Sequence, residues 1–551
     1  MVYMKMIDFL RSRVSIRHRF YLFVLCSALL CGGCNQQQAS NVDTGTQNQI
    51  LHLGNGTEPQ DLDPQTVTGE PERNIILALF EGLISRNPSN LELVPAVAET
   101  WEASADQMTY TFHLRKGAKW SNGDPVTARD FVYTFNRMLH PLLANEYATN
   151  YYPILNAEKF NRGELTDFSQ VGVKASDDYT LVFTMEREWP LFFEAISDIP
   201  PVHQDTIEKF GKISDRGTEW TRPGNIVSNG PFVLDEWVPN KIIKVSRNRQ
   251  YWDQGRVKLN GIYFYPIDNS TTDERMFRTG QLHMINGLPV EKIAEYQKEQ
   301  PELIHIYPIY GTYYYLINTT RPPLNDIRVR KALAMSIDRN QIVTNVTKGG
   351  QIPAYSLNPP DPDGYHPLPG IEYNVENARQ LLAEAGYPDG KDFPAFEIMY
   401  NTLEAHMQIA QAIQQMWLTS LNIKTTLVNQ EWKVFLDTLS QKEFGIARMG
   451  SIAGIADPGD FLDSYTTSSG MNHTSWSNAE YDELVKQAIS TSNRAKRFSL
   501  FQQAEAIFTD EVPLIPIYYY TKVRLMSPDL KGWKDNILDY NLYKDIYLSR
   551  E

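Results

Sequence analysis

Beyond residue 34 this sequence contains no cysteine. The chain of 551 residues has three cysteines, Cys26, Cys31 and Cys34, and all of them lie near its N-terminus. Once this segment is processed, no pair of thiols is left to oxidise, so disulfide bonds are excluded as a source of stability. Stability must come from burying apolar side chains, and a chain long enough for about three domains can bury a large core.

Clusters of basic residues and recognisable catalytic motifs are also missing. The 66 acidic residues outnumber the 52 basic ones, and no basic run occurs beyond the N-terminus, which argues against nucleic acid as a partner. The sequence has no H-E-x-x-H pair, no Cys/His cluster, no G-x-x-x-x-G-K-[ST] loop and no G-x-S-x-G elbow. We therefore expect no metal, no cofactor and no catalytic residue, and a hydrolase has no motif behind it.

The N-terminus has the pattern of a secretion signal. Basic residues between Lys5 and Arg19 precede an apolar stretch at 21–33, which is too short to span a bilayer as a helix. The stretch ends in LLCGGC, which resembles a lipoprotein signal covering 1–33, although Cys31 stands where Leu is usual. Cys34 would then become the lipidated N-terminus and anchor an exported protein to a membrane of the cell envelope or periplasm; cleavage without lipid is the alternative. The polar residues 34–49 predict a flexible tether.

From residue 50 onward, patterns typical of strands and helices alternate along the chain. Residues 110–114 alternate in polarity as a strand does, and Thr127 with Asp130 forms a capping-box pattern before a helix. Residues 512–520 are expected to form a buried strand, and their prolines suggest that it lies at the edge of a sheet. This alternation predicts an α/β fold. Strand, helix, strand and helix patterns follow one another at 396–400, 404–421, 423–428 and 432–439.

Several long blocks resemble the oligopeptide-binding proteins of bacterial peptide ABC importers. They occur in the same order as in that family, and the resemblance covers nearly all of the chain beyond the signal. It implies a periplasmic-binding-protein-like α/β fold, in which two lobes close on a cleft beside an additional lobe. The blocks are NGTEPQDLDPQTVTGEPERN at 55–74, LFEGLI at 79–84, HLRKGAKWSNGDPVTARDFVYTF at 113–135, NDIRVRKALAMSIDR at 325–339 and LVNQEWKVFLDT at 427–438.

The resemblance also implies how the chain is divided and what it does. The first binding lobe is expected to combine 50–80, 202–310 and 522–551, the additional lobe to span 81–201, and the second binding lobe to span 311–521. A ligand that touches both lobes favours the closed state. The closed form is expected to dock on an ABC permease with its cytoplasmic ATPase. The expected protein is a monomeric receptor for extended oligopeptides or a peptide-like solute, bound by backbone pairing.

The ligand contacts of this family fall on a mixed set of aromatic, charged and glycine positions. The aromatic side chains offer flat apolar faces to varied ligand groups, and packing in a core is the alternative for each of them. A helix start and an imidazole at His406 favour an anion, and Arg448 can pair with a carboxylate; a structural role is the alternative for both. The positions are Thr68, Gly69, Glu70, Tyr147, Tyr314, His406, Trp432, Arg448, Gly450, Ser451, Ile452, Gly454 and Tyr520.

The sequence departs from the family pattern at 450–458. Relatives usually read G-W-x-x-D-Y-x-D-P there, and their first Asp holds the free α-amino group of the peptide. Here the row is GSIAGIADP, so Gly454 stands in the place of that Asp. A buried ammonium without a partner costs on the order of several kcal/mol, so a free-amine peptide should bind poorly unless another acid substitutes. Glu70 is the hypothesised substitute, and Asp457 is the less favoured one.

Two other classes of function stay open from the sequence. A receptor of the same fold could bind a ligand without a free α-amino group, such as a murein peptide, an opine-like compound, a haem-related molecule or a signalling peptide. A surface lipoprotein that has lost transport could instead act as an adhesin or a folding helper. The intact set of Tyr, Trp, His and Arg positions argues against a complete loss of ligand binding.

Overall fold

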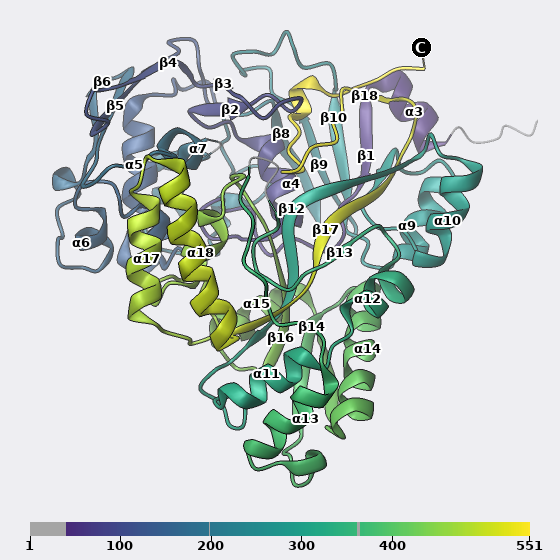
Figure 1. Cartoon of the computed structure of the whole chain (residues 1–551). Coiled ribbons are helices and arrows are strands. Elements are labelled where there is room, and N and C mark those ends of the chain that lie inside the picture. Colours follow the sequence, from purple (N-terminus) through teal and green to yellow (C-terminus); the bar gives the residue numbers. More distant parts are fainter. Residues whose placement is uncertain (1–39, 198, 361–363, 551) are drawn as a thin grey trace, which may run out of the picture.

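The computed structural model describes residues 40–197, 199–360 and 364–550, so the expected signal peptide and Cys34 lie outside the described residues. One mixed sheet of eleven strands forms its framework, with the order β15-β14-β16-β12-β17-β11-β1-β10-β9-β8 and β13 paired to β17 (Figure 1). The predicted α/β class is confirmed. The strands are β1 Ile50–Gly54, β8 Phe232–Val238, β9 Ile242–Arg247, β10 Gly261–Tyr265, β11 Met284–Ile285, β12 Ile304–Ile317, β13 Ile352–Pro353, β14 Phe396–Asn401, β15 Thr425–Gln430, β16 Ile446–Ile452 and β17 Leu514–Met526.

Two long strands connect the two ends of this sheet. β12 and β17 pair antiparallel, with partners that run from Ile304 to Leu316 along β12. The expectation of an edge strand at 512–520 is wrong, because β17 lies between β12 and β11. Its Pro516 stands opposite Tyr314 at a shift in register, where the ladder is interrupted and a missing N–H is tolerated.

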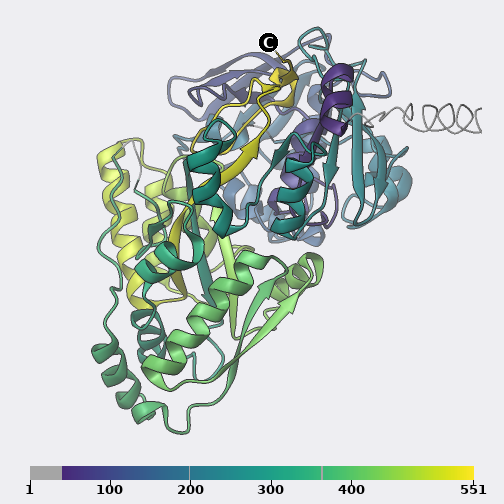
Figure 2. The same cartoon turned by 90° about the vertical axis from the view of Figure 1, so that its right-hand side faces the viewer.

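Each end of the sheet has its own helices, and Figure 2 shows the two ends as lobes joined by the long strands. β1 and β8–β11 lie at one end, and β14–β16 lie at the other. The two-lobed arrangement agrees with the predicted fold, while the predicted lobe boundaries stay a prediction, since the sheet runs unbroken between the lobes. The first end carries α4 Glu70–Leu79, α9 Ser270–Arg278 and α10 Val290–Glu299; the second carries α11 Ile327–Met335, α12 Arg339–Gln341, α13 Val375–Glu384, α14 Glu404–Leu421 and α15 Trp432–Ser440.

A second, antiparallel sheet lies in the segment 81–201 and has the order β4-β5-β7-β6. The predicted strand at 110–114 is part of β5. The helix after it, α5, begins after Thr127, whose backbone N–H donates a 2.6 Å hydrogen bond to Asp130, as the capping box predicts. Buried side chains of this sheet share one continuous core with β1 and β10. The elements are β2 Ile84–Arg86, β3 Leu93–Pro95, β4 Ala98–Ala103, β5 Thr109–Leu114, α5 Ala128–Met138, α6 Ala157–Asn161, β6 Val173–Asp177, β7 Thr180–Thr184, α7 Phe192–Ile196 and α8 Gln204–Phe210.

The expected flexible tether is wrong for its last part, because Asn41–Asn48 form the helix α3. Ser40 caps this helix, and its hydroxyl accepts a 3.0 Å hydrogen bond from the backbone N–H of Asp43. The Asp43 carboxylate in turn pairs with Arg550 near the C-terminus. Polar side chains here form a cap and an ion pair that hold the helix against the fold, which composition alone does not reveal.

The remaining elements complete the second lobe and the C-terminus. A pair of antiparallel helices, α17 and α18, packs together (Figure 1), and their buried side chains share a core cluster with Tyr314 and Leu316 of β12. In the described part of the chain, none of the helices has the length and apolar character needed to cross a membrane. These elements are α16 Gly459–Leu462, α17 Ala479–Ile489, α18 Arg494–Glu511, β18 Leu530–Lys531 and β19 Tyr547–Leu548.

Candidate functional site

The strand β16 offers a free backbone edge. It pairs with β12 along all of 446–452. On its other side, β14 pairs with it only at Ile446 and Ala447. From Arg448 to Ile452 the backbone groups on that side therefore face no strand among the described residues. An extended ligand can pair with such an edge through main-chain hydrogen bonds.

Two tyrosine hydroxyls lie along this part of β16. A Cβ added to Gly450 would lie 2.2 Å from the hydroxyl oxygen of Tyr520, so only a glycine allows that hydroxyl to approach the strand. The hydroxyls of Tyr314 and Ser451 form a 2.7 Å hydrogen bond. The structure thus brings four of the predicted site residues together at the free edge.

Arg448 is a buried cation without an acidic partner. Arg448 is only 9% exposed to solvent. Its Nη2 donates a 2.8 Å hydrogen bond to the hydroxyl of Tyr520, its Nη1 donates a 3.3 Å bond to Asn401, and its guanidinium lies 4.6 Å from the ring centre of Tyr313. No carboxylate pairs with it in the described residues, and its Nε has no partner there. A buried charge without a counter-charge is costly, so this position is suited to an anionic group of a ligand.

His406 lies in the first turn of α14, as predicted. Its Nδ1 lies 3.3 Å from the hydroxyl of Tyr313. Burial, and then repulsion by the Arg448 guanidinium, lower the pKa of His406 well below its ordinary value. The imidazole is therefore neutral at pH 7, and the positive charge near an anion comes from Arg448.

The segment with Thr68, Gly69 and Glu70 meets the other lobe at Trp432. Gly69 is the N-cap of α4, and a Cβ added to it would lie 2.9 Å from the Trp432 ring. The indole N–H of Trp432 donates a 3.2 Å hydrogen bond to Glu72, which is fully buried. Burial raises the pKa of Glu72 to about 7. This contact joins α4 of the first lobe to α15 of the second.

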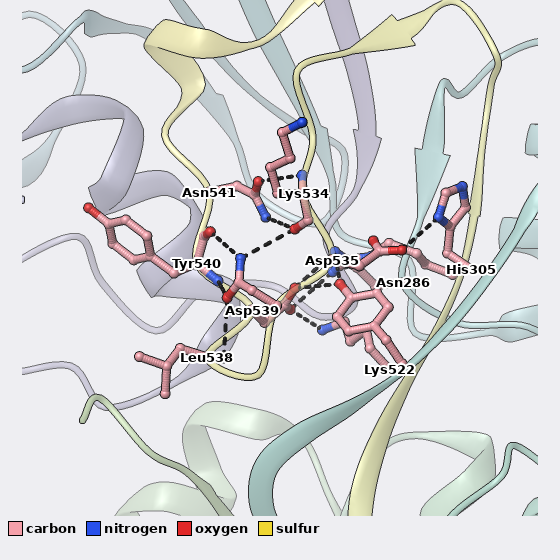
Figure 3. A network of polar contacts seen from close by, with 12 residues as sticks. Asn286, His305, Lys522, Lys534, Asp535, Leu538, Asp539, Tyr540 and Asn541 are labelled. Atoms are coloured by element: carbon pink, nitrogen blue, oxygen red, sulfur yellow. Dashed lines mark hydrogen bonds and ion pairs between the residues drawn. The ribbon is translucent and has the colours of Figure 1, made fainter. Parts of the chain in front are cut away.

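The carboxylate of Glu70 is already paired with a lysine. It accepts a hydrogen bond from Lys522 on β17, and Lys522 is also 3.0 Å from Asp539. Asp539 is held further by Arg524, at 2.9 Å. Figure 3 shows Asp539 within this polar network, with Lys522 beside it. Two acids and two cations balance in this network. The hypothesis that Glu70 supplies a spare negative charge to a ligand therefore loses its support.

A different carboxylate lies at Gly454. Asp460, six residues further along, accepts a 2.8 Å hydrogen bond from the backbone N–H of Gly454. Burial raises the pKa of Asp460 to about 6. Asp457 is not available in the same way, because it forms an ion pair with Arg497 at 2.9 Å. An acid is thus present beside the position where the sequence lacks one.

Tyr147 comes from the segment 81–201, and the charges of Glu146 and Asp460 act on it. It precedes a short turn of helix at Ala148–Tyr151. Burial raises its pKa, and Glu146, Asp460 and then Tyr314 raise it further. The segment 81–201 therefore contributes an aromatic residue close enough to Asp460 for the charge of that acid to act on it.

Sequence reasoning missed Asp460, Glu72 and Lys522. Asp460 lies in the same stretch as Gly454, but only the turn after β16 brings its carboxylate back to the Gly454 N–H. Glu72 and Lys522 are separated from their partners by 360 and 452 residues. A single sequence contains no signal for contacts of such length.

Comparison with known proteins identifies the family of this arrangement. The family model "Bacterial extracellular solute-binding proteins, family 5 Middle" matches residues 92–473. The chain belongs to this family. The periplasmic oligopeptide-binding protein OppA of Escherichia coli is 37% identical over 536 residues, which cover 94% of this chain and 96% of that protein. Proteins of this family are binding proteins, and the predicted resemblance is confirmed.

Two solved structures of family 5 proteins indicate which state this structure represents. Haemophilus influenzae OppA in complex with the peptide RPPGFSPFR matches with a TM-score of 0.86 and 33% identity, covering 91% of this chain and 99% of that one. The unliganded open form of the murein tripeptide-binding protein MppA matches with a TM-score of 0.61 and 33% identity, covering 91% and 97%. The lobe contact between Trp432 and Glu72 agrees with a closed form.

Proposed function

We propose that this family 5 protein is the receptor of an ABC importer and captures extended oligopeptides or a peptide-like solute by closure of its lobes. The observation that carries this proposal is the buried Arg448 at the free edge of β16. The edge supplies main-chain hydrogen bonds that do not depend on sequence, and Arg448 supplies a counter-charge for a carboxylate. Tyr314, Tyr520 and Tyr147 then line the region for varied side chains.

The location and partners follow from the same role. The protein acts outside the cytoplasm and passes its ligand to a membrane permease that a cytoplasmic ATPase drives. Lipid at Cys34 keeps it at the membrane, and it works as a monomer. Lobe closure then presents to the permease a surface that exists only with ligand bound, because the ligand stabilises the closed state through contacts with both lobes.

A second candidate is a receptor of the same fold for a ligand without a free α-amino group. It is favoured by Gly454, because a glycine leaves this position, just beyond the end of β16, without an acidic side chain. Haem-related and murein-derived solutes fall within this candidate. No observation favours an adhesin role, because such a role does not require the charged groups at β16.

Native mass spectrometry of the protein purified from its own host tests the proposal. We expect a ladder of co-purified masses that peptide sequencing resolves into many short peptides. A single defined small molecule would favour the second candidate. A protein that carries nothing, and that shows no binding of any peptide in calorimetry after it has been refolded, would contradict both.

A further inference from the structure

Asp460 is a partly buried acid that forms no ion pair among the described residues. Its carboxylate accepts hydrogen bonds from the backbone at Gly454 and Ile455, and no ion pair joins it to a lysine, arginine or histidine among the described residues. The cation that acts on it most is Arg86, whose Nη2 instead donates a 3.0 Å hydrogen bond to the carbonyl of Glu194. The charge of Asp460 is therefore not compensated within the protein.

An independent observation lies at the other end of the same edge. Arg448 is buried, has no carboxylate partner and keeps an unpartnered Nε. Its guanidinium bonds to the hydroxyl of Tyr520, which lies against the Cα of Gly450. The free edge of β16 thus has an uncompensated positive charge near one end and an uncompensated negative charge just past the other. Two such charges stabilise an opposite pair on one ligand.

The distance between these charges limits the ligand. The guanidinium lies at the level of Gly450, and the carboxylate of Asp460 lies at Gly454, which is four residues further. β16 ends at Ile452 and the chain bends at Gly454, so the roughly 13 Å that four extended residues span at about 3.3 Å per residue is an upper limit to this separation along the chain. A peptide of up to about four residues has its two charged ends within that distance.

We infer that Asp460 binds the cationic group of the ligand, so that an extended zwitterion of up to about four residues lies along β16 with its anionic group at Arg448. This inference rests on the proposed function and names its substrate class. It assigns the role to Asp460 rather than to Glu70, because Lys522 neutralises Glu70, and rather than to Asp457, because Arg497 pairs with it.

Calorimetry with alanine peptides tests the assignment. Unmodified peptides of two to seven residues and their N-acetylated forms are titrated into the ligand-free wild-type protein and into Asp460→Asn. The asparagine keeps an oxygen that can accept the Gly454 N–H, so the loop is expected to stay folded. We expect the wild-type protein to prefer unmodified tri- and tetra-alanine, and Asp460→Asn to bind them at least ~30-fold more weakly. Affinity for the acetylated forms should not change.

Three further variants separate the assignment from general damage. Glu70→Gln and Asp463→Asn remove other acids of the region and should keep the preference for a free amine. Gly454→Asp combined with Asp460→Asn should restore binding, since a Cβ added to Gly454 meets no atom within 4 Å. Thermal melting of every variant reports whether it is folded.

Each outcome decides the assignment. Loss of binding in Asp460→Asn together with rescue by Gly454→Asp would support it. Equal wild-type affinity for unmodified and acetylated peptides would overturn the role of Asp460 while leaving the proposed function intact. Loss of binding in Glu70→Gln but not in Asp460→Asn would return the role to Glu70. Absence of binding to every peptide would overturn the assignment and the proposed function together.

Discussion

At the scale of residues, the site is defined by charges that the protein leaves without partners. Ion pairs are formed at Asp457 and Glu70, whereas Arg448 and Asp460 have none among the described residues. The sequence identified Arg448 from the resemblance, and its burial could not be known before the strands were in place. The sequence also suggested a protonatable His406, and only the fold shows that burial, and then the nearby Arg448, lower the pKa of its imidazole.

Arg448 can be tested by removing its charge. We expect Arg448→Gln to weaken binding of unmodified tetra-alanine by about tenfold to a hundredfold in calorimetry, because the ligand carboxylate loses its counter-charge. Binding of C-terminally amidated tetra-alanine should change little. The ligand-free variant should melt no lower than the wild-type protein, since a buried cation without a partner is removed. A lower melting temperature with equal losses for both peptides would show that Arg448 is structural.

At the scale of elements, the long strands and the first turns of helices position the site. β14 leaves β16 after Ala447, and this divergence creates the free edge. The strand–helix alternation at 396–439 was readable from sequence, because its periodicity is strong. The place of β17 in the middle of the sheet was not readable, because the prolines suggested an edge and the interruption at Pro516 depends on its pairing with β12.

The contact between α4 and α15 predicts a pH dependence of closure. Glu72 accepts hydrogen bonds from Trp432 and from the backbone N–H of Gln60, at 3.2 and 2.6 Å, and Asp61 is the other charge acting on it. Burial raises the pKa of Glu72 to about 7 in the closed form. Below that pH, Glu72 keeps a proton in the closed form that it would lose in an open form with an ordinary carboxyl pKa. This stabilisation of the closed form is complete at low pH and is lost as the pH rises through 7.

Calorimetry from pH 6.5 to 8 checks this expectation. Affinity for tetra-alanine should fall more steeply across this range in the wild-type protein than in Glu72→Gln, which cannot ionise. Loss of the charge on the peptide's α-amino group near pH 8 lowers affinity equally in both proteins. Glu404→Gln is the matched control, because Glu404 also bridges the lobes, through a 2.9 Å bond from Ser270. The same slope in Glu72→Gln as in the wild-type protein would contradict a role for Glu72.

At the scale of the whole molecule, two lobes are held closed around the free edge of β16. The contacts that join the lobes come from distant parts of the chain, such as Trp432 with Glu72 and Ser270 with Glu404. The family and the fold class were predictable because long blocks of sequence resemble the family, whereas the binding positions stay predictions. The state of closure and the helix at 41–48 were not predictable, because they depend on long-range contacts.

Closure on a peptide is the central claim, and small-angle X-ray scattering tests it most directly. The protein is stripped of ligand by unfolding and refolding, and its radius of gyration is measured without and with saturating tetra-alanine, with N-acetylated tetra-alanine as the comparison. We predict that the unmodified peptide reduces the radius of gyration and gives a scattering curve that this closed structure fits. An unchanged curve at a peptide concentration that calorimetry shows to be saturating would contradict capture by closure.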